Sequence, residues 1–295
     1  MDKLVHNLRQ RVPISELEVP NELDSQRLLD TLATITTVNP HYVKSFFSTR
    51  LFEDPQVDQD EYYELFSEVI ISKPLNPTEH DFIEYTIGDT QVIIRETPRI
   101  ISGAGTTGLR TWEAALYLTK FLLTEYRFQL ENKSILELGT GTGLVSLALI
   151  KSIRFKKLMI TDGDSTLIEA LSYNFRANQI NIEKDIRVSC RSLWWGQDTP
   201  PASDIIVAAD VTYDSDVIPS LVACIEDGLK NGAKEAIIAA TIRNEDTIKT
   251  FDNVLTARSL SWEVINKVKR PGELNGEDLW YSKVTPEIRI YRISI

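Results

Sequence analysis

Apolar residues in the first 71 positions recur at the spacing of amphipathic helices. After Asp24, a candidate N-cap, four aliphatic side chains fall on one face of a helix. These side chains are Leu28, Leu29, Leu32 and Ile35. The run DEYYELFSEVII, residues 60–71, repeats the spacing, and prolines divide the segment into pieces. We therefore expect a helical N-terminal segment over residues 1–75, which carries no catalytic pattern. Such a segment serves as a recognition module, as a cap that stabilises the fold, or as both.

The hydrophobic pattern changes after residue 80. The run FIEYTIGDTQVIIRE, residues 82–96, alternates on both sides of Gly88-Asp89, which favours a β-hairpin. A glycine-rich loop then leads into a helix that starts near Thr111. Farther on, strands are expected at about 134–139, 157–161, 186–193, 204–209 and 235–242, with helices at about 143–153, 165–178, 215–230 and 245–258. This alternation predicts a mostly parallel sheet covered on both faces.

The last part of the chain departs from this alternation. Two strand-like runs, residues 261–270 and 287–295, are separated by a loop and by no helix. A parallel pair needs a crossover connection, so this pair is expected to be antiparallel. We predict an α/β fold over residues 76–295, with a mostly parallel sheet and an antiparallel last strand. This outline resembles the Rossmann-like seven-strand methyltransferase fold.

A glycine turn follows the strand expected at 134–139. The run ILELGTGTGLV places Gly139, Gly141 and Gly143 between two apolar segments, which is typical of a strand, a cofactor-binding turn and a helix. A dinucleotide turn requires G-x-G-x-x-G, and Leu144 stands where its third glycine would be. The spacing therefore favours S-adenosylmethionine over NAD. A tight turn without a ligand is the alternative interpretation.

Two further strand ends carry acidic residues. Asp162, in ITDGD, stands where a carboxylate can accept hydrogen bonds from both hydroxyls of a ribose, in dinucleotide and methyl-donor proteins alike. Asp210 and Tyr213, in AADVTYD, follow another strand at the edge where open α/β sheets bind ligands. A D-P-P-Y or N-P-P-Y sequence would have indicated methylation of a base nitrogen. The sequence Asp-Val-Thr-Tyr fits a different acceptor.

These segments carry a family resemblance. In order, TWEAA, ILELGTGTGLV, ITDGD, LWWG and AADVTYD resemble the seven-strand protein-lysine methyltransferases, which have a D-x-x-Y signature after strand four. The resemblance covers about residues 80–295. With its helical N-terminal segment and GTTGLRTWEAALYL, the chain is most similar to the members that act on translation elongation factor 2. The resemblance implies an S-adenosylmethionine-dependent protein-lysine N-methyltransferase whose partner is a folded protein, elongation factor 2.

The resemblance also implies roles for individual residues. The cofactor-binding residues would be Trp112, Gly139, Thr140, Gly141, Asp162, Trp195 and Ala209. Trp195 is assigned to the adenine because it precedes Gly196, and Trp194 stays open as the alternative. Asp210 would bind the arriving cation, and Tyr213 would present its ring or hydroxyl to the amine. Core packing for the aromatic residues and a turn role for Asp210 are the alternatives.

Composition limits the partners. The formal net charge of −11 argues against direct nucleic-acid binding and fits a basic protein surface. No run of about 18 apolar residues is present, so no membrane partner is expected. The two cysteines, Cys190 and Cys224, form no metal or redox motif. We expect a cytoplasmic monomer without a metal.

Recognition and activity leave alternatives open. The acidic run at residues 53–64 could meet a basic partner, although such runs are usually solvated. Tyr62, Tyr63 and Phe66 are the candidate anchors, with core packing as the alternative for Phe66. A methyltransferase of the same fold could act on another protein, a small molecule or RNA. A non-enzymatic adaptor is a third interpretation, which the intact glycine turn, Asp162 and Asp210 argue against.

Overall fold

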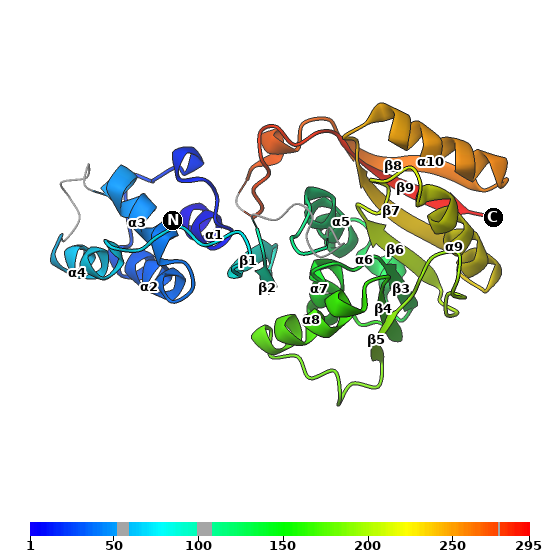
Figure 1. The fold of residues 1–295 in the computed structure, drawn as a ribbon, viewed down its shortest axis with the longest axis horizontal. Helices are drawn as coiled ribbons and strands as arrows, with labels where there is room; N and C mark the ends of the chain where they lie inside the picture. The colour runs from blue at the N-terminus through cyan, green and yellow to red at the C-terminus, as the bar shows by residue number, and fades with distance from the viewer. Residues whose placement is uncertain (52–58, 99–107, 277) are drawn as a thin grey trace. The chain divides into compact units, whose positions relative to one another are not determined.

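The computed structural model describes residues 1–51, 59–98, 108–276 and 278–295. The chain divides into two compact units (Figure 1). The first comprises Met1–Ile100 with Asn275–Trp280, and the second comprises Ile101–Leu274 with Tyr281–Ile295. The first unit therefore contains both the N-terminal helices and the predicted hairpin. The predicted domain boundary at residue 75 stays a prediction about independent folding.

The first unit begins with a group of short helices. They are α1 (Asp2–Arg9), α2 (Ser25–Thr36), α3 (Pro40–Phe46) and α4 (Gln59–Val69), with helical turns at Ile14–Glu16 and Phe47–Leu51. The cap that the sequence predicted is present, because the Asp24 side chain accepts a hydrogen bond from the N–H of Arg27. Leu28, Leu32 and Ile35 are buried as expected, in a hydrophobic cluster of the first unit.

The helix α4 is divided into a buried face and an exposed face. Tyr62 is buried, and its hydroxyl donates a hydrogen bond to the carbonyl of Ser25 at 3.0 Å. The prediction of Tyr62 as an exposed anchor is therefore wrong, because helical spacing turns it with Leu65 toward the core. Tyr63 is half exposed, as an anchor requires. Most of the acidic run before the helix lies outside the described residues.

A buried ion pair joins the hairpin to the helices. Strands β1 (Asp81–Ile87) and β2 (Thr90–Glu96) are antiparallel, with the turn at Gly88-Asp89 that the sequence predicted. The guanidinium of Arg11 donates to both carboxylate oxygens of Asp81, at 3.1 and 3.2 Å. The amide of Asn39 donates to the same carboxylate at 2.6 Å. These contacts place the hairpin in one polar network with the loops that follow α1 and precede α3.

The second unit contains a seven-stranded sheet in the order β5-β4-β3-β6-β7-β9-β8. Its strands are β3 (Ser134–Leu138), β4 (Lys157–Asp162), β5 (Val188–Ser192), β6 (Ile205–Ala209), β7 (Glu235–Thr241), β8 (Ser261–Val268) and β9 (Ile288–Ser294). Strands β3 to β7 pair in parallel, whereas β9 is antiparallel to both β7 and β8. The predicted sheet with an antiparallel last strand is confirmed, and β9 is inserted between β7 and β8.

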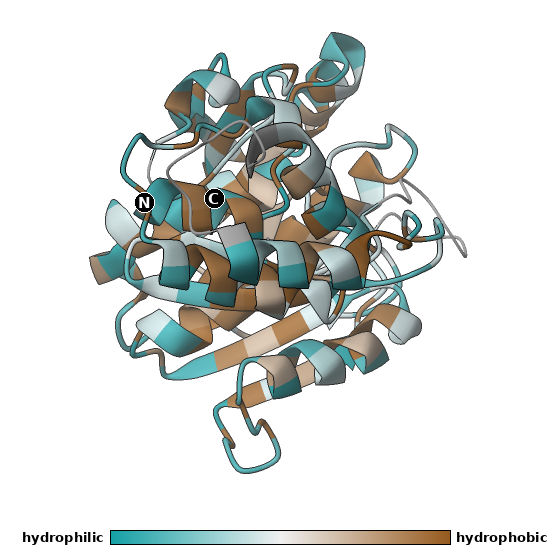
Figure 2. Ribbon diagram, turned by 90° about the vertical axis from the view of Figure 1, so that its left-hand side faces the viewer, coloured by the Kyte–Doolittle hydropathy of each residue, from teal (hydrophilic) through white to brown (hydrophobic). Residues whose placement is uncertain are grey.

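Helices cover both faces of this sheet. They are α5 (Glu113–Thr124), α6 (Arg127–Leu130), α7 (Leu144–Ser152), α8 (Ser165–Ala177), α9 (Ile218–Lys230) and α10 (Glu245–Ala257), with a 3-10 turn at Pro271–Leu274. Figure 1 shows α5, α7 and α8 on one face and α9 and α10 on the other. The central strands β3, β6 and β7 are almost entirely buried, and hydrophobic positions follow the strands in Figure 2. Among the described residues, no helix has the length and hydrophobicity needed to cross a membrane.

Candidate functional site

A cavity of about 450 Å³ opens at the carboxyl ends of β3, β4 and β6 in the second unit. This volume falls in the range of small-molecule sites, and the carboxyl edge is where open α/β sheets bind ligands. Every site residue named from the sequence lines the cavity. They are Trp112, Gly139, Thr140, Gly141, Asp162, Trp195, Ala209, Asp210 and Tyr213. The structure thus brings the set together, whereas the role of each member stays a prediction.

The glycine turn joins β3 to α7 with almost no space for side chains. Gly139 has a φ of +64°, and a Cβ there would lie 2.7 Å from Cγ1 of Val211. At Gly143, with a φ of +85°, a Cβ would lie 2.5 Å from Cδ2 of Leu171. The positive φ favours glycine at both positions, and at Gly139 the packing of Val211 also leaves no room for a Cβ. The resulting bare backbone lets a ligand approach closely at the cavity floor.

Asp162 ends β4 beside this turn. Its Oδ2 accepts a hydrogen bond from the N–H of Gly141 at 2.9 Å, and its Oδ1 accepts one from the N–H of Asp164 at 3.0 Å. Each oxygen therefore keeps acceptor capacity, as two neighbouring ribose hydroxyls would need. Burial raises the pKa of Asp162, while these backbone hydrogen bonds oppose the rise. The acceptor oxygens of Asp162 and the exposed backbone of the glycine turn fit the nucleoside part of S-adenosylmethionine.

Glu137 is a buried carboxyl group that the sequence analysis did not single out. The hydroxyls of Thr140 and Ser146 donate to its Oε2, the first at 3.0 Å. Burial raises the pKa of Glu137 to about 7, the two hydroxyl donors lower it, and the nearby Asp162 adds to the rise. The sequence could have indicated Glu137 as a residue near the site, because it lies two residues before Gly139. Glu137 ties the turn to the first part of α7.

Both tryptophans of LWWG line the cavity, in different surroundings. Trp195 packs against the sheet's hydrophobic cluster, and its ring would lie 3.4 Å from a Cβ at Gly139. Its indole N–H is buried and has no hydrogen-bond partner in the described part of the chain. Trp194 is more than half exposed. The structure therefore supports packing of Trp195 on the turn, and the assignment of the adenine to Trp195 or Trp194 stays a prediction.

Asp210 lies one residue past β6 and is buried. Its Oδ1 and Oδ2 accept hydrogen bonds from Arg243 Nη1 at 3.0 Å and Nη2 at 2.7 Å. The N–H and the hydroxyl of Thr241 donate to the same two oxygens, each at 3.1 Å. An arriving cation would have to compete with these four donors. The expected cation-binding role of Asp210 is thus at odds with the partners that the carboxylate already has.

Arg243 and Arg110 are cavity residues that the sequence analysis missed. Their guanidinium carbons lie 4.6 and 4.4 Å from the centroid of the Trp112 ring, within the range of cation–π contact. Burial alone would lower the pKa of Arg243, but hydrogen bonding and charge from Asp210, with charge from Glu113, raise it overall. Arg243 therefore stays protonated. A usable signal was present, because β6 and β7 are parallel neighbours and the residues after their carboxyl ends meet at one edge.

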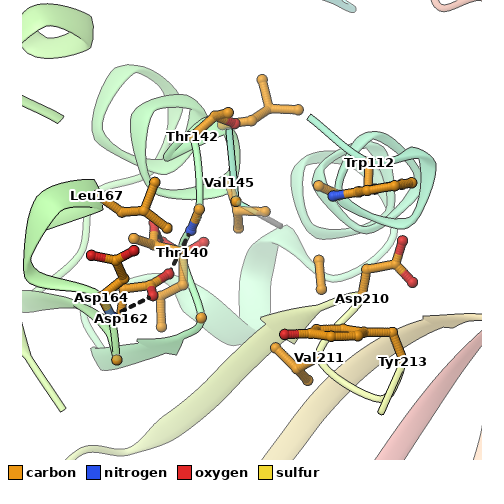
Figure 3. A pocket seen from close by; sticks show the side chains of 18 of the residues that line it. Trp112, Thr140, Thr142, Val145, Asp162, Asp164, Leu167, Asp210, Val211 and Tyr213 are labelled. Carbon is orange, nitrogen blue, oxygen red and sulfur yellow. Dashed lines mark hydrogen bonds between the residues drawn. The ribbon is translucent and has the colours of Figure 1, made fainter. Parts of the chain in front are cut away.

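The two ends of the cavity differ in character. Figure 3 shows Asp162 and Asp164 on one side of the pocket and Trp112, Asp210 and Tyr213 on the other. Tyr213 is half exposed, so its ring is accessible to a molecule that enters from solvent. No group of His, Cys, Asp and Glu in the described ranges could hold a metal ion. We name the side with Asp162 and Asp164 the nucleoside end, after the ligand part that it is expected to hold, and the side with Trp112, Asp210 and Tyr213 the aromatic end.

Comparisons with known proteins agree with this site. A lysine methyltransferase family model matches residues 98–257. The chain is 30% identical over 336 residues to "Protein-lysine N-methyltransferase EFM3" of Saccharomyces cerevisiae, covering 99% of this chain and 98% of that protein. It is 34% identical over 224 residues to human "Protein-lysine N-methyltransferase EEF2KMT", covering 70% of this chain and 66% of that protein. For "Protein-lysine N-methyltransferase EFM3" of Chaetomium thermophilum the identity is 37% over 172 residues, covering 54% and 50%.

The family model spans more than half of the chain and includes the glycine turn, Asp162, Asp210 and Arg243. The relation to the yeast protein extends over nearly the full length of both chains. Membership in this family implies S-adenosylmethionine as the methyl donor, in agreement with the fit of the nucleoside end. The chain belongs to the lysine methyltransferase family.

Proposed function

We propose that this protein transfers a methyl group from S-adenosylmethionine to a lysine of translation elongation factor 2. The observation that carries the proposal is one cavity that joins the glycine turn and Asp162 to the D-x-x-Y loop, Asp210 to Tyr213. The choice of substrate is supported by the human relative, whose name, EEF2KMT, refers to elongation factor 2. Because that factor works in translation, we also propose a cytoplasmic location.

The nucleoside end would hold the methyl donor. In this proposal Asp162 accepts the ribose hydroxyls, Trp195 contacts the adenine, and the backbone of Gly139 and Gly141 lies along the donor. The bound donor supplies a methyl group on a positively charged sulfonium. Calorimetry should show binding of S-adenosylmethionine and none of NAD. Binding of NAD alone would exclude the cofactor assignment.

The aromatic end would receive the lysine. A free lysine has a pKa of about 10.4, so presenting its neutral amine at neutral pH costs roughly 4 kcal/mol. Removal of water by the apolar lining disfavours the ammonium form and lowers this cost. Tyr213 would offer its ring to the amine and the methylated product, an attraction of about 0.5–2 kcal/mol. The chain then contributes chiefly by orienting the amine and excluding water.

We propose that the first unit helps to recognise the protein substrate. The exposed face of α4 carries four acidic side chains beside the half-exposed Tyr63. These are Asp60, Glu61, Glu64 and Glu68. The described residues that line the cavity all belong to the second unit, so this face of α4 is not required to build the donor site. Its charge is complementary to a basic protein surface and would mainly raise the rate of encounter.

Charge reversal on α4 tests this recognition role. Replacing Glu61, Glu64 and Glu68 by lysine should raise KM for elongation factor 2 about tenfold at low salt and leave the methyl-donor Kd unchanged. The matched control reverses three exposed acidic residues of the second unit, which are Glu183, Asp246 and Glu273. An equal effect of both triple variants would show nonspecific attraction and exclude a specific role for α4.

The proposed activity as a whole can be tested in a cell lysate. The protein is incubated with lysate and with S-adenosylmethionine labelled in its methyl group. A labelled band at the mass of elongation factor 2 supports the proposal. A different labelled protein would refute the substrate, labelled RNA would favour a nucleic-acid methyltransferase, and the absence of label would favour a non-enzymatic adaptor.

A further inference from the structure

The carboxylate of Asp210 is already occupied by partners from its own chain. Its side chain is only 5% exposed, and its two oxygens accept four hydrogen bonds from Arg243 and Thr241. A carboxylate offers about four acceptor sites in total. A lysine could bind Asp210 only by displacing one of these donors. Displacement of Arg243 would cost both of its hydrogen bonds to a carboxylate that is itself 5% exposed.

The backbone of Asp210 directs the carboxylate toward these partners. Asp210 has a φ of +56°, in the left-handed region that aspartate adopts more readily than most residues other than glycine. Its N–H donates to the carbonyl of Ala239 at 2.8 Å, which fixes the start of the turn to β7. Strained conformations persist where surrounding contacts determine them, and they cluster at functional sites.

Arg243 connects Asp210 to the wall of the cavity. Its guanidinium lies against Trp112, and its Nη2 lies 3.6 Å from Oε2 of Glu113. The other oxygen of Glu113 accepts a hydrogen bond from Arg110, which also contacts the Trp112 ring. Trp112 is thus held by two guanidinium groups that share Glu113. Arg243 therefore links the carboxylate of Asp210 to the indole of Trp112.

We propose that Asp210 is a positioning residue that acts on methyl transfer through Arg243. It fixes the guanidinium against Trp112 and so sets the cavity wall against which donor and amine are aligned. This inference rests on the proposed function and changes the role of the D-x-x-Y aspartate from cation binding to orientation. Direct contact with the amine is left to Tyr213 and the apolar lining. A displacement of about 1 Å in such a wall can reduce turnover about 100-fold.

A double-mutant cycle tests the inference. Asp210→Asn, Arg243→Gln and the double variant are compared with the wild type for kcat, for KM and for methyl-donor Kd and stoichiometry. Residues that act as one unit are not additive. We expect kcat to fall about 100-fold in each single variant and no further in the double variant. The binding stoichiometry should stay that of the wild type, because the fold is kept.

Two more variants distinguish the orienting role of the Arg243 guanidinium from an effect of its charge and from a general effect of removing an arginine. Arg243→Lys keeps the charge but loses the planar fork, so its kcat should fall about tenfold with unchanged stoichiometry. Arg289→Gln is the control, since Arg289 pairs with Glu287 and does not line the cavity, and its kcat should be unchanged.

Other results would overturn the inference. Wild-type kcat in Arg243→Gln beside a large loss in Asp210→Asn would show that Asp210 acts directly. Losses that multiply to about 10,000-fold in the double variant would show independent roles. Full activity of Arg243→Lys would reduce the role of Arg243 to its charge. The outcomes above concern only the role of Asp210 and leave the proposed function intact. The proposed function itself would be refuted if the wild-type protein neither bound S-adenosylmethionine nor transferred its methyl group.

Discussion

Each unit of the molecule contains a bidentate aspartate–arginine pair, and the two pairs differ in access. In the first unit the side chains of Arg11 and Asp81 are 10% and 1% exposed. In the second unit Asp210 is 5% exposed, but Arg243 is 35% exposed and lines the cavity. One member of each pair has a left-handed backbone, Arg11 at a φ of 58° and Asp210 at 56°. The Arg11–Asp81 pair is almost entirely buried, whereas the Asp210–Arg243 pair is accessible to a ligand through Arg243. We call the first the closed pair and the second the open pair.

The difference shows that an ion pair gains its role from its surroundings. Asp81 is enclosed by Arg11, Asn39 and its own chain, so its contacts serve the joining of hairpin and helices. Arg243 presents its guanidinium to Trp112 in the cavity wall, so its contact with Asp210 can influence a bound molecule. Loss of the first pair should therefore reduce stability, whereas loss of the second should chiefly reduce function.

The largest expected effect on stability is at the closed pair. Arg11→Ala leaves the carboxylate of Asp81 buried without its cation, which should lower the free energy of unfolding by about 3–5 kcal/mol. The methyl-donor Kd should not change, since Arg11 does not line the cavity. Urea unfolding and calorimetry measure the two quantities. If the free energy of unfolding fell by less than about 1 kcal/mol, the Arg11–Asp81 pair would not have the stabilising role that separates it from the Asp210–Arg243 pair.

The next largest effect concerns the affinity for the methyl donor in the cavity of the second unit. Asp162→Ala removes a charged acceptor from the nucleoside end, so methyl-donor binding should weaken by about 1.5–3 kcal/mol, roughly 10- to 150-fold in Kd. Asp185→Ala is the control, because Asp185 pairs with Arg187 and does not line the cavity. Unchanged calorimetric affinity in Asp162→Ala would exclude the ribose contact.

The backbone architecture could be predicted from the sequence better than the polar contacts. The Asp24 cap, the Gly88-Asp89 turn and the alternation of strands and helices depend on neighbouring residues, so local patterns indicate them. The insertion of β9 between β7 and β8 depends on long-range pairing, which periodicity does not encode.

The site shows the same division. Strand ends and the glycine turn pointed to Gly139, Gly141, Asp162, Asp210 and Tyr213, because parallel strands end at one edge. Trp112 and Trp195 were expected from the family resemblance alone. The contact between Asp210 and Arg243 joins residues 33 positions apart and was missed. Inferring it would have required a comparison of the residues just past the carboxyl ends of two neighbouring strands. Helical spacing alone should have placed Tyr62 in the core.

A smaller effect is expected from the pH dependence of Glu137. Its pKa in the folded protein is about 7, against about 4.3 when unfolded, so between these values the folded state holds a proton that the unfolded state has lost. The free energy of unfolding therefore falls as pH rises through this window and levels off above it. Glu137→Gln removes the effect.

The measurement compares wild type and Glu137→Gln at pH 5.5 and pH 8. The loss of stability between these two pH values should be about 2 kcal/mol greater in the wild type than in the variant. This difference isolates Glu137 from the other carboxyl groups, which both proteins share. Identical pH dependence would show that Glu137 is ionised in the folded protein across this range.

The smallest effect is expected at an ion pair that is open to solvent in the first unit. Arg9 contacts Glu84 at 2.7 Å, with a third of its side chain exposed. Arg9→Ala should lower the free energy of unfolding by at most about 1 kcal/mol. It is the matched control for Arg11→Ala, since both arginines meet an acidic residue of β1. Equal losses in the two variants would show that burial does not distinguish them.

The most direct test of the central claim uses purified components. Elongation factor 2, taken from cells that lack this enzyme, is incubated with the protein and S-adenosylmethionine labelled in its methyl group, and its peptides are mapped by mass spectrometry. We predict the label on a lysine side chain of elongation factor 2, with the Asp210→Asn rate about 100-fold below that of the wild type. Donor binding without any labelled lysine in elongation factor 2 would contradict it.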